Sequence, residues 1–246
     1  MTCRLSAMGA SGLDPGTWKG VIESLEEFMP YYERANRATT LGALERWRAL
    51  ASRTASAADV VLEIGPGPGS FARTLPCHRV YLLEPSRRIL RFSRKNLAEA
   101  RYVALSGLAE AIPLREGSVD KVFCIFSFRD FLDHRRSLEE MYRVLCPAGE
   151  LHILDLFRPP PGLRRKLMDL WLRRGAGALM DLVVPSRIRR GWKRDPYVEL
   201  RKTYEAIGPG EGYADLMREV GFTHIAATEL RLRAVYLLEG VKPSTT

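Results

Sequence analysis

The sequence has no apolar run of 18 residues, and only four cysteines and four histidines among 246 residues. Without a long apolar run, we expect no transmembrane helix. The N-terminal stretch has one arginine and no long apolar segment, so we expect no secretory signal. These absences favour a cytoplasmic protein.

The cysteines are also too scattered for a metal site or a disulfide framework. None of them forms a Cys-x-x-Cys pair, and no histidines cluster with them; they are Cys3, Cys77, Cys124 and Cys146. We therefore expect no metal and a reduced setting. Cys124 lies in an apolar run and is interpreted as a small core residue.

Basic residues outnumber acidic ones, 38 against 29, and this excess of nine is concentrated in one segment. Residues 158–202 hold thirteen lysines or arginines against four acidic residues, which is also a difference of nine. An apolar stripe runs through the segment at helical spacing, formed by Leu163, Leu167, Leu170 and Trp171. The segment is either a lid that packs on the domain or a membrane-surface contact that gathers a lipid-like substrate. We do not expect nucleic acid, because no aromatic residues alternate with the basic ones.

The middle of the chain alternates short apolar runs with helical patterns, which is typical of a parallel sheet. The predicted strands are Asp59–Ile64, Arg79–Glu84, Arg101–Leu105, Val119–Phe126 and Glu150–Leu156. The predicted helices between them are Ser70–Leu75, Pro85–Ala100 and His134–Leu145, and Pro147-Ala148-Gly149 is predicted to form a turn. Near the C-terminus, a helix over Tyr213–Val220 precedes two β-rich runs, Phe222–Glu229 and Leu232–Leu238. Their short connection predicts an antiparallel pair.

We expect one globular domain built from four segments. Residues 1–56 form a helical extension that starts with an untethered stretch, 1–13, and residues 57–156 form the α/β core. Residues 157–211 are the basic amphipathic insertion, and residues 212–246 supply a helix and a closing hairpin. A mostly parallel, seven-stranded sheet that ends in an antiparallel hairpin is the architecture of Rossmann-like methyltransferases.

The most informative stretch is Val60–Ser70, where a strand is followed by three glycines and then a helix. Glycines allow the backbone to approach a ligand closely, and the helix start offers free N–H groups. Such a turn binds nucleotide-like ligands in α/β sheets. The spacing is G-x-G-x-G, not the dinucleotide pattern, and Glu63 stands two residues ahead of the first glycine. A carboxylate there would repel pyrophosphate but suits a sulfonium, as in S-adenosylmethionine.

Further residues at the strand ends support S-adenosylmethionine as the cofactor. Glu84 ends the second predicted strand and suits a ribose diol, because a carboxylate accepts two hydroxyl hydrogens. The stretch after the third strand could contact an adenine edge. We predict that the cofactor is held by Glu63, Gly65, Gly67, Pro68, Gly69, Glu84, Leu108, Ala109 and Ile125.

Several motifs follow a recurring family pattern. They are Phe28…Tyr32-Glu33-Arg34-Ala35-Asn36…Thr40…Gly42…Trp47, Ala109-Glu110-Ala111-Ile112-Pro113-Leu114 with Ser118-Val119-Asp120, Arg129-Asp130, Tyr142-Arg143-Val144-Leu145-Cys146-Pro147-Ala148-Gly149, and Met217-Arg218-Glu219-Val220-Gly221-Phe222. Over nearly the whole chain the sequence resembles the class I methyltransferases, and among them the ubiquinone/menaquinone biosynthesis C-methyltransferases. It departs from the family pattern at Pro68, Leu108, Ile125 and Asp130.

The resemblance implies transfer of a methyl group from S-adenosylmethionine to a ring carbon of a hydrophobic, polyprenylated quinol. Arg129 would stabilise a phenolate, Asp130 or His134 or a water would accept the proton, and Tyr32 and Asn36 would orient the ring. A homodimer and a peripheral position at the inner face of the membrane are both compatible with this expectation. Two alternatives stay open: another acceptor, such as a small acid, a phospholipid head group or tRNA, and a non-catalytic binding protein on the same fold.

Overall fold

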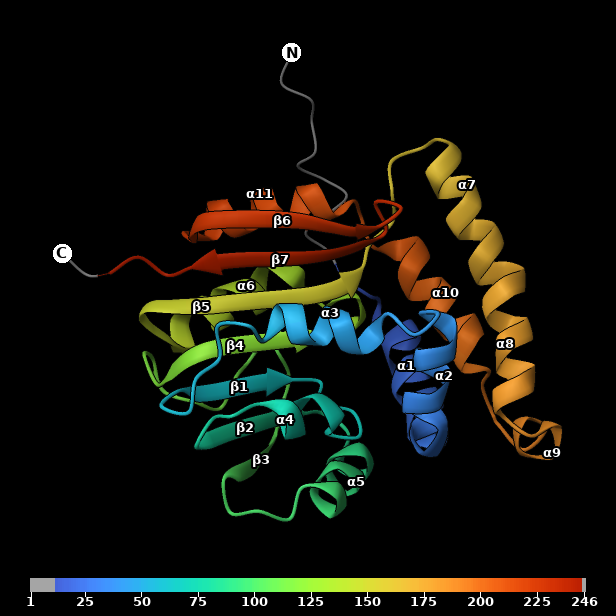
Figure 1. Cartoon of the computed structure of the whole chain (residues 1–246), viewed down its shortest axis with the longest axis horizontal. Helices are drawn as coiled ribbons and strands as arrows, with labels where there is room; N and C mark the ends of the chain where they lie inside the picture. The colour runs from blue at the N-terminus through green and yellow to red at the C-terminus, as the bar shows by residue number, and fades with distance from the viewer. Residues whose placement is uncertain (1–11, 245–246) are drawn as a thin grey trace.

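The computed structural model describes residues 12–244, in which seven strands form one mixed sheet (Figure 1). The strands are β1 (Val60–Ile64), β2 (Arg79–Glu84), β3 (Tyr102–Ser106), β4 (Val119–Ile125), β5 (Leu145–Leu156), β6 (Thr223–Arg231) and β7 (Val235–Val241). Their order is β3-β2-β1-β4-β5-β7-β6. Strands β1 to β5 are parallel, and β7 is antiparallel to both β5 and β6. The predicted sheet with its closing hairpin is therefore confirmed, whereas Cys3 and most of the untethered stretch lie outside the described residues.

The helices fall into two groups. Those that flank the sheet are α3 (Leu44–Ala51), α4 (Ser70–Thr74), α5 (Arg87–Asn96), α6 (His134–Val144) and α11 (Gly210–Val220). Those gathered beside the carboxyl ends of the parallel strands are α1 (Pro15–Phe28), α2 (Tyr32–Thr39), α7 (Leu163–Leu170), α8 (Ala176–Val183), α9 (Ser186–Arg189) and α10 (Pro196–Ala206). Short helical turns occur at η1 (Met29–Tyr31) and η2 (Phe128–Asp130), and a π-helical segment, η3 (Trp171–Gly175), joins α7 to α8.

Two predicted boundaries are wrong for local reasons. The predicted turn at Pro147-Ala148-Gly149 lies inside β5, where Ala148 has a positive φ of 63° and the register with β4 shifts. An advance of two residues on β4, from Val119 to Lys121, corresponds to five on β5, from Leu145 to Glu150, so β5 accommodates the extra residues without ending. The connection between β6 and β7 lies two to three residues later than predicted, so Leu232 is in the turn and not in a strand.

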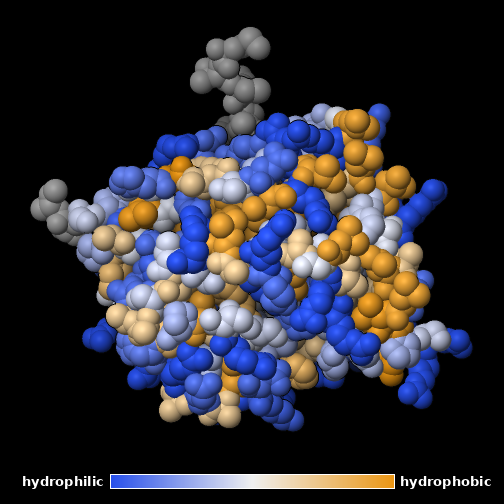
Figure 2. Space-filling model, in the orientation of Figure 1, coloured by the Kyte–Doolittle hydropathy of each residue, from blue (hydrophilic) through white to orange (hydrophobic). Residues whose placement is uncertain are grey.

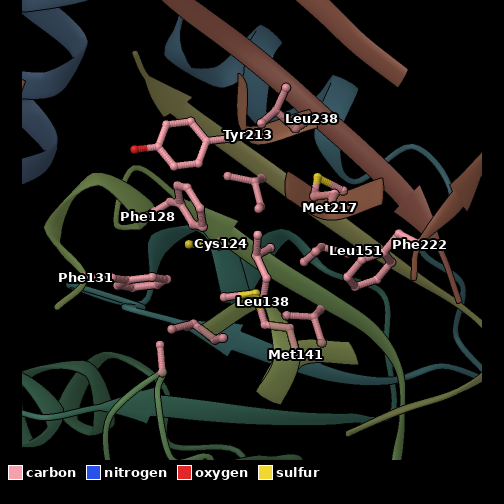
Figure 3. Packing of buried hydrophobic residues seen from close by; sticks show 14 of the residues in the cluster. Cys124, Phe128, Phe131, Leu138, Met141, Leu151, Tyr213, Met217, Phe222 and Leu238 are labelled. Atoms are coloured by element: carbon pink, nitrogen blue, oxygen red, sulfur yellow. The ribbon is translucent and has the colours of Figure 1, made fainter. Parts of the chain in front are cut away.

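Buried side chains fill both faces of the sheet. On one face, α6 and α11 pack through Leu138, Met141 and Met217 (Figure 3), and Cys124 lies in the same cluster as predicted. On the other face, α3 and α4 contribute Trp47 and Phe71. Because each such side chain stabilises the fold by about 1.5–3 kcal/mol when fully buried, the two layers fix the sheet between them.

The second group of helices forms a cap, which we define as α1, α2 and α7–α10. The cap lies beside the carboxyl ends of the parallel strands (Figure 1). Within the cap, α1 packs against α10 and α2 packs against α8. Ligands of open α/β sheets bind beyond these strand ends. The cap therefore closes the side of the sheet on which a ligand is expected.

A buried charge cluster joins the hairpin to the rest of the sheet, away from the cap. The Nδ1 atom of His152 lies 3.0 Å from Glu239 Oε1, and its Nε2 atom lies 3.0 Å from Glu150 Oε2. Lys121 and Arg53 pair with the same two carboxylates. Burial alone would lower the pKa of His152, but the two carboxylates raise it above its usual value. The two carboxylates therefore favour the protonated, cationic form of His152.

This cluster predicts a pH-dependent contribution to stability. Since the pKa of His152 is raised by folding, the contribution is fully present below the unfolded value of about 6.5 and is lost as pH rises through the folded value. We expect His152→Gln to lower the free energy of unfolding by about 1–3 kcal/mol at acidic pH and by less at alkaline pH. Urea titrations of both proteins across this range measure the difference. A difference that is constant, or that grows with pH, would contradict the charged state.

Candidate active site

Two adjoining cavities lie between the cap and the carboxyl ends of the strands. The smaller has a volume of about 80 Å³ and the larger about 600 Å³. Three residues line both: Tyr32, Phe126 and Arg129. A group passed from a ligand in one cavity to a ligand in the other would cross at these three side chains.

The smaller cavity lies over the glycine turn. Five of the nine predicted cofactor residues line it, namely Gly65, Gly67, Glu84, Leu108 and Ala109. Helix α1 covers the opposite side with Trp18, Ile22 and Leu25. The structure thus brings the turn, the acid at the end of β2 and the stretch after β3 to one place.

The turn itself has the backbone that only glycine adopts easily. Gly67 has a φ of 53°, and a Cβ added to it would point at the Tyr32 ring, 3.7 Å away. A side chain there would therefore occupy the boundary between the two cavities.

The other four predicted cofactor residues do not line the smaller cavity but lie in or next to the elements that form it; they are Glu63, Pro68, Gly69 and Ile125. Pro68 is buried and its carbonyl accepts a hydrogen bond from Asn96 Nδ2 at 3.0 Å, whereas a Cβ on Gly69 would clash with Leu97. Ile125 packs in the core at the end of β4. Sequence spacing alone does not distinguish the residues that face the cavity from those that hold the turn.

Glu63 is the fourth of these residues and is unusual because it is buried. Its Oε2 atom has no hydrogen-bond partner in residues 12–244, and burial raises the pKa of its carboxyl to about 8. An isolated buried carboxylate is unfavourable unless a donor or a cation compensates it. Since Glu63 lines neither cavity and its raised pKa favours the neutral acid, the structure does not place a carboxylate charge of Glu63 against a ligand.

Glu84 is placed as a ribose-binding carboxylate requires. Its Oε1 atom accepts a hydrogen bond from the backbone N–H of Ser86 at 3.0 Å, and the side chain lines the smaller cavity. Burial raises the pKa of Glu84 to about 7, helped by the negative charges of Glu26 and Asp130 and opposed by the Ser86 N–H. The site therefore fits S-adenosylmethionine through a carboxyl for the ribose and a glycine turn that line the same cavity.

The larger cavity is mainly apolar and contains the predicted acceptor residues. It is lined by Tyr32 and Asn36, which the sequence predicts to orient the ring, and by Arg129, which it predicts to stabilise the phenolate. Its apolar walls come from α3, the carboxyl ends of β4 and β5, the insertion and the hairpin, through Leu44, Trp47, Phe126, Leu156, Met168, Trp171, Leu172, Leu200 and Val235. Sequence reasoning missed Tyr197 on α10 and Arg231 at the end of β6, because neither lies in a motif.

Arg129 is held by an acid that the sequence did not reveal. Its Nη1 atom donates to Asp155 Oδ1 at 2.5 Å and to the Phe126 carbonyl at 3.0 Å. Its Nε atom lies 3.7 Å from Asp130 Oδ1 and has no hydrogen-bond partner in the described chain. Burial opposes the charge, but Asp130 and Asp155 raise the pKa of Arg129 above its ordinary value. The guanidinium is thus a fixed cation with a donor to spare.

The two predicted proton acceptors have different surroundings. Asp130 lines the smaller cavity, and burial raises the pKa of its carboxyl to about 6 although Arg129 lowers it. His134 lines neither cavity: it is packed among Phe128 and Tyr213 in the core, and burial lowers its pKa to about 4. The structure differs from the sequence prediction of His134 as a proton acceptor, because its ring faces the aromatic core and not the site.

The π-helical segment shapes the outer wall of the larger cavity. Trp171 lines the cavity, and its ring lies directly against Gly175, where an added Cβ would meet ring atoms at 2.3 Å. π-Helical turns are often found at functional sites. Here the turn and the glycine together determine where the indole lies.

Replacing Gly175 with alanine is expected to push Trp171 out of this position. We expect destabilisation of about 1–3 kcal/mol from overpacking, together with a lower kcat/KM for the methyl acceptor. Thermal unfolding and steady-state kinetics measure the two effects. Gly177→Ala is the matched control, since a Cβ there meets nothing within 4 Å and alanine is the better helix former. Equal effects of the two substitutions would exclude the indole contact as the cause.

Comparison with known proteins agrees with this geometry. Residues 62–153 match the family described as "Methyltransferase domain". The chain is 30% identical over 206 residues to the demethylmenaquinone methyltransferase of Thermus thermophilus, which covers 80% of this chain and 90% of the relative. It is 26% identical over 229 residues to the enzyme of that name from Clavibacter sepedonicus, covering 91% of each.

Solved structures share the fold at lower identity. A methyltransferase of Thermotoga maritima that depends on S-adenosylmethionine has a TM-score of 0.62 at 21% identity, covering 92% of this chain and 99% of that one. Phosphoethanolamine N-methyltransferase 2 of Haemonchus contortus, in complex with S-adenosyl-L-methionine, has a TM-score of 0.61 at 15% identity, covering 82% and 53%. The chain is a class I methyltransferase that uses S-adenosylmethionine, and it belongs to the family of the demethylmenaquinone methyltransferases.

Proposed function

We propose that this methyltransferase methylates a ring carbon of a polyprenylated quinol of the demethylmenaquinol type. The observation that carries the proposal is the apolar cavity of about 600 Å³, which shares Tyr32, Phe126 and Arg129 with the cofactor cavity. Relatives that cover most of the chain are named for methylation of demethylmenaquinone. A cavity lined by aromatic and aliphatic side chains suits a ring system with an apolar tail.

Bound S-adenosylmethionine supplies a methyl group that is already activated by the sulfonium charge. The protein must therefore align the acceptor and make its ring carbon nucleophilic. Loss of a proton from the ring hydroxyl gives a phenolate, whose electron pair is shared with the neighbouring ring carbon. That carbon would take the methyl as the bond to sulfur breaks, and would then lose its own ring proton while the oxygen regains one. The Arg129 guanidinium, which lines both cavities, would stabilise that phenolate, because a fixed cation in a buried site needs no reorganisation.

Asp130 is the proposed proton acceptor. Its carboxyl lies beside Arg129 and lines the cofactor cavity, and its pKa of about 6 leaves it ionised at neutral pH. An acceptor with this pKa is matched to transfer near neutrality. Tyr32 and Asn36 would hold the ring in place from α2.

Arg231 would bind the second oxygen of the quinol. Its guanidinium lies 5.3 Å from the centre of the Trp47 ring and donates from Nη1 to the Thr40 carbonyl at 3.2 Å. It forms no ion pair within residues 12–244, and it lines the larger cavity but not the cofactor cavity. A second cation in the larger cavity suits a quinol ring, because the ring carries oxygens on opposite sides.

A phospholipid, a tRNA and a small acid are alternative acceptors to the quinol, and a deletion strain distinguishes among them. A strain that lacks the gene is expected to accumulate a quinone short of one methyl group, detected by mass spectrometry of its lipid extract. The wild-type gene should restore the mature quinone, and a gene encoding Arg129→Lys should not. An unchanged quinone together with an unmethylated phospholipid, tRNA nucleoside or small acid would exclude the quinol and identify the acceptor.

We also propose a contact with a membrane surface through residues 158–202. No helix in the described part of the chain is long and apolar enough to cross a bilayer. The supporting features are the basic excess of the segment and its exposed leucines on α7. A peripheral contact would bring the cavity to an acceptor that is dissolved in lipid.

A further inference from the structure

The mouth of the larger cavity is rimmed by leucines that are both part of its lining and open to solvent. Leu41 is 62% exposed, Leu167 45% and Leu232 40%, and all three line the cavity. They come from the turn after α2, from α7 and from the turn between β6 and β7. The cavity therefore opens to the outside between apolar side chains from three distant parts of the chain.

Two of these leucines are held in an unfavourable backbone conformation. Leu41 has a φ of 54° and Leu232 a φ of 50°, in the left-handed region that glycine and asparagine tolerate better. An exposed apolar side chain on such a backbone contributes little to folding. Strain of this kind is commonly retained where a side chain serves a function.

The outer side of the insertion extends this apolar rim. Leu163 and Leu170 flank Leu167 at spacings of four and three residues, so the three share one face of α7, and all are exposed. Leu182 is exposed on α8. Figure 2 shows the result as an orange band over α7 and α8, with blue side chains projecting beside it.

Basic side chains predominate around the rim, and five of them have no ion-pair partner in the described chain, whereas Arg164 and Arg189 pair with Glu229 and Asp181. Lys166, Arg173, Arg174, Arg187 and Arg190 are exposed, and no ion pair with any of the five occurs in residues 12–244. Unpaired cations next to exposed leucines match a surface that is anionic outside and apolar beneath. An anionic bilayer has this arrangement.

We infer that the mouth docks on an anionic bilayer, with Leu41, Leu167 and Leu232 reaching below the head groups and the basic side chains contacting them. The cavity would then open directly into the lipid, and a polyprenylated acceptor would enter ring first with its tail still in the membrane. This inference rests on the proposed function for the identity of the acceptor, but the docking surface stands on its own geometry. It adds the two turns at Leu41 and Leu232 to the contact proposed for residues 158–202.

The first test removes the two strained leucines. Leu41→Asn with Leu232→Asn is expected to weaken binding to phosphatidylcholine vesicles that contain phosphatidylglycerol by about tenfold or more, because two apolar side chains no longer enter the lipid. The melting temperature should stay the same or rise, because asparagine relaxes both turns. Vesicle flotation and thermal unfolding measure the two quantities. Unchanged vesicle binding would overturn the inference.

The second test removes charge with a matched control. Arg173→Gln with Arg174→Gln is expected to weaken binding to the anionic vesicles several-fold, whereas Arg91→Gln with Arg94→Gln, on the exposed face of α5, should have little effect. Both double variants should methylate a short-chain, water-soluble acceptor at the wild-type rate. Equal loss of binding in the two variants would mean that net charge alone attracts the protein, and would overturn a specific docking face.

The outcomes for docking and for function are distinguishable. If vesicle binding needs the leucines and the arginines but no quinol is methylated, the proposed acceptor is wrong and the docking surface stands. If the enzyme methylates quinols yet ignores anionic vesicles, the docking inference is wrong. Binding of the rim to a protein partner, with no binding to vesicles, would also overturn it.

Discussion

Replacing Arg129 with lysine is expected to lower kcat about a hundredfold while the protein stays folded. Loss of one fixed donor to a developing oxyanion typically costs a factor of about 10²–10³. Lysine keeps a positive charge beside Asp155, which is fully buried and would be costly to leave unpaired. An ammonium, however, lacks the planar fork with which the guanidinium binds Asp155 and the Phe126 carbonyl and keeps further donors.

The pH profile identifies the cause of this loss. If Arg129 stabilises the phenolate, the rate of the lysine variant should recover as pH approaches the pKa of a free phenol, about 10. Arg143→Lys is the matched control, because Arg143 pairs with Glu140 on α6 and lines neither cavity. A wild-type rate in Arg129→Lys, or an equal loss in Arg143→Lys, would contradict the assigned role.

Replacing Glu84 with alanine is expected to raise the Kd for S-adenosylmethionine about 10–100-fold. If Glu84 binds the ribose diol, the substitution removes two hydrogen bonds to a charged acceptor, and a factor of ten corresponds to about 1.4 kcal/mol. Isothermal titration calorimetry with the cofactor measures the change. Glu116→Gln, on an exposed turn, is the control and should bind the cofactor normally. Unchanged affinity in Glu84→Ala would refute the ribose contact.

The wild-type protein should also bind the cofactor more tightly as pH rises through about 7. Burial raises the pKa of Glu84 to about 7, and only the ionised carboxylate accepts both hydroxyl hydrogens. The Kd should therefore fall as pH rises through this value, and Glu84→Gln should bind weakly without this dependence. The same pH dependence in Glu84→Gln would assign it to another group, such as Glu63.

The sheet and the cofactor site could be predicted from sequence because their signals are local. A glycine turn, an acid at a strand end and a short hairpin connection each lie within a few consecutive residues. The order of the strands follows from simple rules for parallel sheets. This is why the sequence predicts Gly65, Gly67 and Glu84, which line one cavity in the structure, as cofactor residues.

The walls of the acceptor cavity could not be predicted in the same way, because they depend on contacts between distant segments. Asp155 is an acid inside an apolar strand, and only the fold shows that it holds Arg129. Arg231 and Tyr197 lie outside every motif, and their approach to the cavity depends on how the hairpin and α10 pack. His134 was misplaced because a histidine near a strand end resembles a catalytic group until its packing is known.

An isotopic label on the transferred methyl group shows whether the enzyme methylates a ring carbon of the quinol. The purified enzyme is supplied with S-adenosylmethionine that carries an isotopically labelled methyl group and with a short-chain demethylmenaquinol, and the product is examined by nuclear magnetic resonance. We expect the label on a ring carbon of the quinol, with one equivalent of S-adenosylhomocysteine formed. A label on a quinol oxygen would contradict C-methylation. No transfer to the quinol, while a phospholipid, a tRNA or a small acid is labelled, would contradict the proposed acceptor.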